Sequence, residues 1–231
     1  MTTDDSYQVT PSTKIRRMPA RSTYDKCEID EILKEGLVCH VAFQADGRPC
    51  CIPMAYAKME EKLYVHGSIA SRLLKSMKGG LEVCITVTLL DGLVLARSGF
   101  HHDMLFRSVM AFGTAEPVTD EAEKERVLGA LVDHIIPGRN AQIRQPTSAE
   151  LRATSLLALQ LEEVSAKVRT GLCEDDEADY ALPMWAGVLP ISTAVVGSPE
   201  ADHRLPIGIE VPSNVQEYSR KPAANTLGAG T

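Results

Sequence analysis

The chain has 231 residues, of which 44% are hydrophobic and 24% are charged, so it can bury a substantial core in one large domain or two small ones. Its formal net charge of -7 and its 5% aromatic content argue against a general nucleic-acid binder, which needs a basic surface and stacking platforms. No apolar run approaches the roughly 20 residues that span a bilayer, and the polar N-terminus lacks a signal-peptide pattern, so we expect a cytoplasmic protein without a membrane partner.

The N-terminal residues 1–22 are polar and basic and have no apolar period, which predicts an extended arm. A first helix should follow, because Asp25 and Glu28 have capping-box spacing and Gly36 stops the apolar pattern. We expect the folded domain to cover residues 23–195. The segment 196–231 is rich in Pro, Gly, Ser and Ala, which predicts a flexible C-terminal tail.

Runs of apolar and β-branched residues, separated by turn signals, predict an antiparallel sheet after this helix. Pro53 lies inside the second run and predicts a strand edge or an interrupted ladder at that point. Asp91-Gly92 is a hairpin signal between two later runs. The expected strands are 37–44, 50–57, 63–65, 81–90, 93–97, 104–118 and 156–170.

Two helices are expected before the last strand. The apolar residues of 119–136 fall on one face of a helix that Pro137-Gly138 ends, and Thr147 and Glu150 form a second capping box. Six or seven short strands with peripheral helices favour a mainly β fold, an antiparallel barrel.

The segment 63–83 predicts an anion site. A strand ends at a turn containing Gly67, and a short apolar pattern of helical spacing follows it. The start of such a helix offers unpaired N–H groups, and hydroxyls and cations stand beside it, as a phosphate would require. The alternative is a surface helix whose cations are solvated. The candidate phosphate ligands are Ser68, Ser71, Arg72 and Lys75.

Three stretches carry a family resemblance: HGSIASRLL, RSVMAFGTAEPV and GRPCCIPMAYA. These stretches and the order of the elements along the chain resemble the FMN-binding split barrel of the pyridoxamine 5'-phosphate oxidase-like superfamily. SAKVRTG followed by MWAGVLPI is similar to its branch of flavin-nucleotide-binding and nitroimidazole-resistance proteins. The resemblance covers roughly residues 15–192. It implies a six- to seven-stranded antiparallel split barrel that binds FMN.

The resemblance also implies roles for individual residues. Ser71 and Arg72 would hold the FMN phosphate with Lys75 nearby, and Gly67 would let the backbone approach. The residues Cys51, Ile52, Pro53 and Met54 would lie beside the flavin ring. Arg107 and Ser108 would reach the cofactor from the other subunit of a homodimer.

The function that the resemblance implies is an FMN-dependent oxidoreductase acting on a small molecule, with a reduced nicotinamide as electron source. Pyridoxamine phosphate is not the expected substrate, because Cys51 and Tyr56 stand where those oxidases carry basic residues. The alternative is a non-catalytic split-barrel protein that binds flavin or haem.

Five further residues each have a functional interpretation and a plainer structural one. His66 could face the flavin ring as a catalytic group, or could be a strand-end histidine bonded to backbone. Lys167 could line the cofactor site or a solvent face, and Trp185 could cover the flavin or pack in a core. His101 and the adjacent His102 favour a solvated loop, and the six cysteines show no CxxC spacing, so no metal site is expected.

Overall fold

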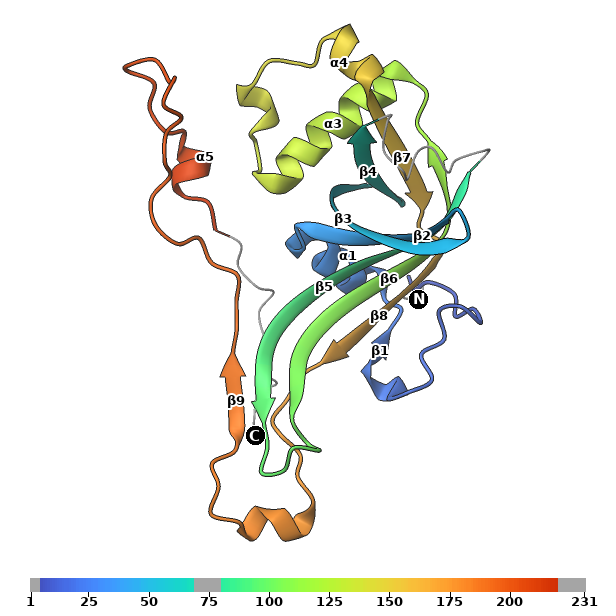
Figure 1. Ribbon diagram of the computed structural model, residues 1–231, viewed down its shortest axis with the longest axis vertical. Coiled ribbons are helices and arrows are strands. Elements are labelled where there is room, and N and C mark those ends of the chain that lie inside the picture. The colour runs from blue at the N-terminus through green and yellow to red at the C-terminus, as the bar shows by residue number, and fades with distance from the viewer. Residues whose placement is uncertain (1–4, 69–79, 220–231) are drawn as a thin grey trace.

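The computed structural model describes residues 5–68 and 80–219, and its centre is a single antiparallel sheet closed on itself (Figure 1). The strand order is β1-β8-β6-β7-β4-β3-β2-β5-β9, and an additional pairing of β6 with β5 closes a ring of six strands, β6-β7-β4-β3-β2-β5. The predicted antiparallel barrel is therefore confirmed. Its ring strands are β2 (Val38–Ala45), β3 (Arg48–Met59), β4 (Lys62–Ser68), β5 (Leu81–Leu95), β6 (Asp103–Pro117) and β7 (Thr154–Gln160).

Three strands extend the sheet beyond the ring. They are β1 (Ser22–Thr23), β8 (Glu163–Arg169) and β9 (Gly187–Pro190). The helices are α1 (Lys26–Glu35), α3 (Glu121–Ile135), α4 (Ser148–Ala153) and the short α5 (Ser213–Gln216). Single 3-10 turns occupy Pro19–Arg21 (η1), Asn140–Gln142 (η2) and Glu177–Ala181 (η3). None of the helices in the described ranges is both long and apolar enough to span a bilayer.

The helices begin where their capping residues predict. The Asp25 side chain accepts a hydrogen bond from the Glu28 N–H at the start of α1, and Asp120 does the same for Glu123 at the start of α3. Both halves of the Thr147–Glu150 capping box are formed at α4. These local contacts explain why the helix starts could be read from sequence.

The barrel encloses one apolar core, and a second, smaller core lies outside it. Alternate residues of β2 and β5, such as Val41 and Ile85, point inward and are almost fully buried together with Ile32 of α1. On the outside, Val127 and Leu131 of α3 pack against the outward side chains of β3, β4 and β7. The barrel is thus closed by α1 and covered on one side by α3 (Figure 1).

Two strand predictions were wrong in detail. No hairpin forms at Asp91-Gly92, because β5 continues to Leu95 with a register shift between Leu90 and Gly92, and the Asp91 carboxylate is buried in an ion pair. The predicted last strand is divided at Leu161 and Glu162 into β7 and β8, which both pair with β6. At Asp91-Gly92 the predicted turn is an irregularity within one continuous strand. At Leu161 and Glu162 the predicted continuous strand is interrupted by a bend.

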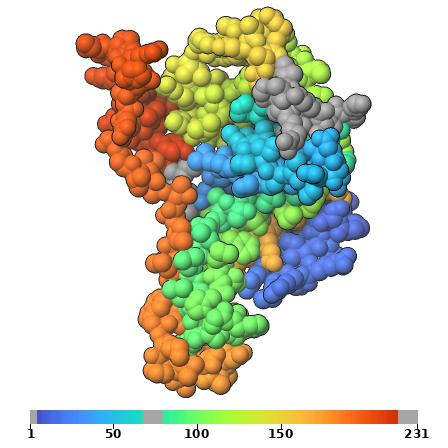
Figure 2. Space-filling model, in the orientation of Figure 1, coloured from blue at the N-terminus to red at the C-terminus, as the bar shows by residue number. Residues whose placement is uncertain are grey.

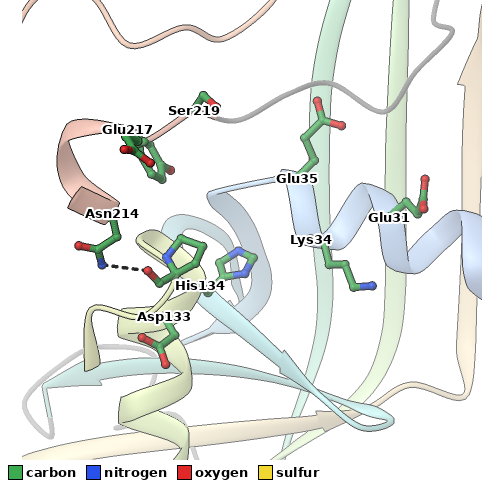
Figure 3. A pocket seen from close by; sticks show the side chains of 10 residues that line it. Glu31, Lys34, Glu35, Asp133, His134, Asn214, Glu217 and Ser219 are labelled. Carbon is green, nitrogen blue, oxygen red and sulfur yellow. Dashed lines mark hydrogen bonds between the residues drawn. The ribbon is translucent and has the colours of Figure 1, made fainter. Parts of the chain in front are cut away.

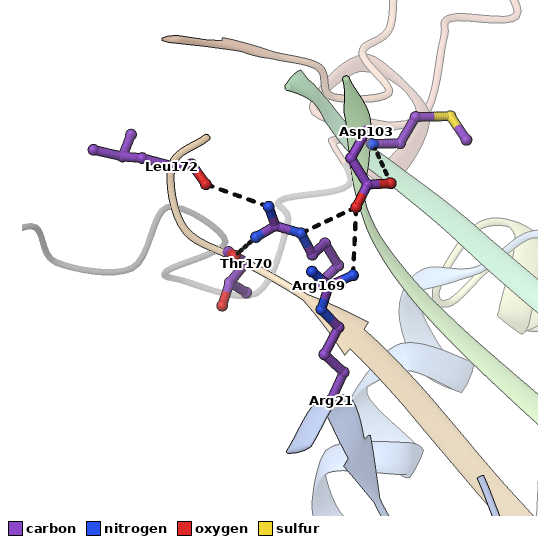
Figure 4. A network of polar contacts seen from close by, with 6 residues as sticks. Arg21, Asp103, Arg169, Thr170 and Leu172 are labelled. Atoms are coloured by element: carbon purple, nitrogen blue, oxygen red, sulfur yellow. Dashed lines mark hydrogen bonds and ion pairs between the residues drawn. The ribbon is translucent and has the colours of Figure 1, made fainter. Parts of the chain in front are cut away.

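Beyond the ring, β5 and β6 continue as a long arm, here defined as residues 91–106 with the segment 170–190 packed against it (Figure 1). Arg97 binds Asp175 through its backbone N–H and its guanidinium at 2.9 and 2.8 Å. Nearby, Asp103 accepts hydrogen bonds from Arg21 and Arg169, both at 3.3 Å (Figure 4). Ion pairs therefore hold the arm together.

The chain ends differ in how they lie. Tyr7 is buried and its N–H donates to the Tyr24 carbonyl, so the N-terminal segment packs on the barrel. After β9, the chain runs along one side of the molecule as the orange column of Figure 2 and reaches α3, where Asn214 donates to the Pro137 carbonyl. The domain boundaries at residues 22 and 195 stay predictions.

Candidate functional site

The first feature of the site is the opening between β3 and β4. The two strands pair from Met59 opposite Lys62 up to Tyr56 opposite Val65, and there the ladder stops. Beyond this point β3 continues along β2, and β4 continues along β7 to Ser68. One edge of β3 is therefore without a strand partner in the described chain, as Pro53, which has no N–H to donate, had predicted.

Strand alternation divides the four residues that were predicted to lie beside a flavin ring. Cys51 and Pro53 point to the outside of the barrel and are exposed. Ile52 and Met54 point the other way and pack against the core. Only Cys51 and Pro53 therefore offer their side chains to a ligand outside the barrel, while all four residues offer backbone along the open edge.

His66 lies at the end of β4 beside this opening. It is exposed, pairs in the ladder with Leu156 and follows Tyr64 and Val65 on the same strand. Gly67 and the backbone of Ser68 continue the pairing with β7. Three of the predicted phosphate ligands, Ser71, Arg72 and Lys75, lie outside the described residues. His66 and Gly67 thus lie at the end of β4, directly before the predicted phosphate ligands in the chain.

The outer surface of the barrel beside His66 has an unusual composition for an acidic protein. Twelve outward positions on four neighbouring strands, β3, β2, β5 and β6, carry no Asp, Glu, Lys or Arg. We call this the uncharged face. It consists of Cys51, Pro53, Ala55, Val38, His40, Ala42, Cys84, Thr86, Thr88, Ser108, Met110 and Phe112.

The solvated face of an antiparallel sheet usually carries polar and charged side chains. On the uncharged face, by contrast, the apolar Val38 and Met110 are 48% and 39% exposed. The uncharged face also contains three residues predicted for the cofactor site, Cys51, Pro53 and Ser108. It is therefore continuous with the opening between β3 and β4 and is suited to an apolar ligand or a partner surface.

Arg107 lies on the opposite side of β6 from Ser108 and is 6% exposed. Its guanidinium donates to Glu35 at 2.6 and 2.8 Å and to Asp91 at 2.8 and 2.9 Å. Burial alone would lower the pKa of Arg107, but the hydrogen bonds and charges of Asp91 and Glu35 outweigh it and raise the pKa. These partners all belong to its own chain. The role of Arg107 across a dimer interface stays a prediction.

The two remaining candidates lie apart from each other. Lys167 of β8 is half-buried opposite Ser108, and the described chain gives its ammonium group no ion pair. It stands at the border of the uncharged face. Trp185 is 71% exposed at the far end of the arm, just before β9, and its ring lies over Gly187. The structure brings Lys167 next to Ser108, and it leaves Trp185 apart from the other candidates.

A separate cavity of about 700 Å³ lies between α1, α3 and α5 (Figure 3). Glu31 and Glu35 of α1 face Glu217 across it, and Asp133 of α3 adds a further carboxylate. None of the predicted site residues lines this cavity. Sequence reasoning missed it because its walls come from segments roughly 80 to 100 residues apart, and no motif links them.

The comparisons with known proteins agree with this architecture. The family model described as "Pyridoxamine 5'-phosphate oxidase" matches residues 25–168. The chain belongs to this family. The matched segment runs from the N-cap of α1 to β8, so the pyridoxamine 5'-phosphate oxidase-like unit contains the whole ring and the opening between β3 and β4. A search of curated protein sequences gives no significant match.

Solved structures of this family place the chain more closely. The flavocytochrome Anf3 from Azotobacter vinelandii is 38% identical, with a TM-score of 0.86 over 92% of this chain and 98% of that one. A FAD and haem binding protein from Mycobacterium smegmatis is 34% identical, with a TM-score of 0.80 over 85% and 96% of the two chains. A candidate 5-nitroimidazole antibiotic resistance protein from Bacteroides thetaiotaomicron shares the fold, at 22% identity and a TM-score of 0.55 over 64% and 86%.

Proposed function

We propose that this chain is a flavin-binding protein that also holds haem, so that electrons pass between the two cofactors. The observation that carries the proposal is the similarity to the two relatives whose names state a flavocytochrome and a FAD and haem binding protein. Each is more than 30% identical, and this chain covers nearly the full length of both. This supports the alternative reading of the sequence better than an FMN enzyme with a small-molecule substrate.

The described residues fit a flavin at the opening between β3 and β4. The free edge of β3 offers backbone groups to the ring, and the exposed Cys51 and Pro53 leave room beside it. His66 and Gly67 stand where the chain enters the predicted phosphate site of Ser71, Arg72 and Lys75. A bound flavin supplies one- and two-electron transfer, and the chain's task is to position it and to control access to it.

We propose FAD as the flavin, because the second relative is named for it. FMN, which the sequence motifs imply, is the alternative. The distinction is chemical, since FAD carries a second phosphate and an adenine that must also be held. Denaturing the purified protein and separating the released flavin by chromatography decides between them.

We further propose that the protein is a homodimer in which the uncharged face meets a second copy. A face without charges that keeps Val38 and Met110 exposed is unfavourable in water and favourable in an interface. An isologous contact would create two equal cofactor sites, one on each side of the two-fold axis. Ser108 and Lys167, at the border of this face, would then lie near the partner's cofactor.

An FMN-dependent oxidoreductase acting on a small molecule is the second candidate. The match to an oxidase family model favours it. It would transfer electrons from a reduced nicotinamide to a substrate stacked on the ring, with His66 as the candidate proton donor. Turnover with a nicotinamide cofactor in a protein that holds flavin but no haem would favour this candidate.

The absorption spectrum of the purified protein tests the proposal. We expect flavin bands together with a Soret band that shifts on reduction. A pyridine haemochrome assay should identify and quantify the bound haem. Reconstitution with FAD and haemin should restore both bands to protein made without them. A protein that binds flavin but never haemin would leave the FMN oxidoreductase reading, and a protein that binds neither would refute both.

A further inference from the structure

The six histidines fall into two groups by their contacts. The His134 ring nitrogen lies 2.7 Å from the Gly36 carbonyl, and that of His102 lies 2.8 Å from the Ser98 carbonyl. His101 and His203 each lie within 4 Å of an aspartate carboxylate. For His40 and His66, the described residues provide neither a hydrogen bond nor an ion pair.

His40 occupies the middle position of β2 on the uncharged face. It pairs with Pro53 on one side and with Thr86 on the other, and Met110 lies opposite Thr86 on the next strand. It is exposed, whereas the residues before and after it, Cys39 and Val41, are buried in the barrel. The ladders on both sides of this central strand fix the backbone position from which the imidazole projects.

A haem site requires a surface for the porphyrin ring and a ligand for the iron, and the surroundings of His40 provide both. The macrocycle is a flat apolar disc, so it is best received by a surface without charges, and its iron binds a neutral imidazole nitrogen. Of these two histidines, His66 stands at the strand end beside the opening assigned to the flavin, and His40 stands within the uncharged face next to it. We propose that His40 would bind the haem iron through a ring nitrogen and that the uncharged face would hold the haem.

This inference rests on the proposed function and gives it a geometry. Pro53 joins the two sites, since it lies on the open edge of β3 assigned to the flavin and opposite His40 in the ladder. The two cofactors would therefore be neighbours on one surface of the barrel. The part of the uncharged face that the haem leaves free would remain for the contact with the second copy in the proposed dimer.

The test uses the full chain, loaded with FAD and titrated with haemin while the Soret band is recorded. His40→Ala should weaken haemin binding by at least about 100-fold, since even residues that only orient a metal ligand contribute roughly 10- to 100-fold. Flavin binding should persist and so report that the variant is folded. Added imidazole should restore a Soret band close to that of the unaltered protein. His203→Ala, at a solvent-exposed histidine of the C-terminal segment, is the matched control and should bind haemin normally.

His40→Met is the second variant, because a thioether can also bind haem iron and should change the position of the band rather than abolish it. If His40→Ala binds haemin with unchanged affinity and spectrum, the assignment is wrong. If His66→Ala loses haem instead, His66 is the ligand and the inference is overturned while the proposed function stands. If the unaltered protein takes up flavin but no haemin, the proposed function and this inference fail together.

Discussion

The barrel and the arm are built from the same two strands, β5 and β6, but different forces hold them. In the barrel, inward residues such as Val41, Ile85 and Leu157 are nearly inaccessible to water and touch one another. In the arm, the pair of Arg97 with Asp175 and the ladder of β9 with β5 hold the segment 170–190, and Asp103 pairs with Arg169 just before it. Screening by moderate salt and titration of a partner weaken ion pairs but do not act on the burial of apolar area, so the two regions should respond differently to the same change of solvent.

The largest effect is expected at the junction of the two regions, where Arg107 binds Glu35 and Asp91. Arg107→Ala removes the buried cation that Asp91 and Glu35 share, so it should reduce the free energy of unfolding by about 3–5 kcal/mol. Urea denaturation measures it. Arg144→Ala is the control, because Arg144 makes a comparable two-pronged pair with Glu150 at an exposed position and should change stability little. Equal effects of the two variants would show that burial does not decide the value of these pairs.

The next effect is expected inside the barrel. Leu157→Ala removes a side chain that is 2% exposed and leaves a cavity, which should cost about 2–5 kcal/mol. The loss should be the same at low and high salt, because no charge is involved. A strong salt dependence in denaturation experiments would contradict the division between an apolar barrel and an ionic arm.

A smaller and local effect is expected in the arm. Arg97→Ala removes both the ion pair to Asp175 and the stacking on the Tyr180 ring, 5.1 Å away. Amide hydrogen exchange should therefore become faster in the segment 170–190, while the barrel strands keep their protection. Lys58→Ala removes a 2.8 Å pair to Asp30 beside α1 and is the control, which should leave exchange in the arm unchanged.

The same contact should respond to pH. Burial would raise the pKa of Asp175, but the hydrogen bonds and charge of Arg97 lower it below the ordinary value of 3.8. A carboxyl group whose pKa is lowered by folding stabilises the fold above its unfolded pKa and loses this contribution as the pH falls toward the folded value. The protection factor of the segment 170–190, which corrects for the intrinsic pH dependence of amide exchange, should thus fall below about pH 4 and stay constant above it. In Asp175→Asn this pH response should be absent.

Thiol chemistry gives the smallest perturbation, because it distinguishes the inside of the barrel from its outside without altering the fold. Burial raises the pKa of the Cys39 thiol to about 12, while Cys51 on the neighbouring strand is exposed. An alkylating reagent near pH 8 should modify Cys51 quickly and Cys39 only after unfolding. Bound flavin should slow the reaction of Cys51. Rapid modification of Cys39 in the native protein would mean that β2 and β3 open readily.

What the sequence predicts well here is local. The caps predicted at Asp25 and Thr147 lie within three residues of the N–H groups they bind, and Pro53 lies on the open strand edge that it predicted. The hairpin signal at Asp91-Gly92 was misleading for the opposite reason. Its carboxylate is taken by Arg107, 16 residues away in sequence, and a tertiary ion pair overrides a turn preference worth little by itself.

The candidate site shows the same limit. Alternation along β3 could have separated Cys51 from Ile52 in advance, because strand periodicity is a sequence property. The uncharged face could not be seen, since it appears only when four strands are placed side by side in register. His40 carries no motif of its own. It becomes a candidate ligand through its neighbours in space, which the order of residues does not reveal.

The register shift in β5 between Leu90 and Gly92 has a mechanical consequence. A ladder bends most easily where its regular hydrogen bonds are interrupted. We therefore expect bending between the barrel and the arm to occur at this shift. Asp91 at this shift is tied through Arg107 to Glu35 at the end of α1. Bending of the arm at this position would therefore also displace α1, the helix that closes the barrel.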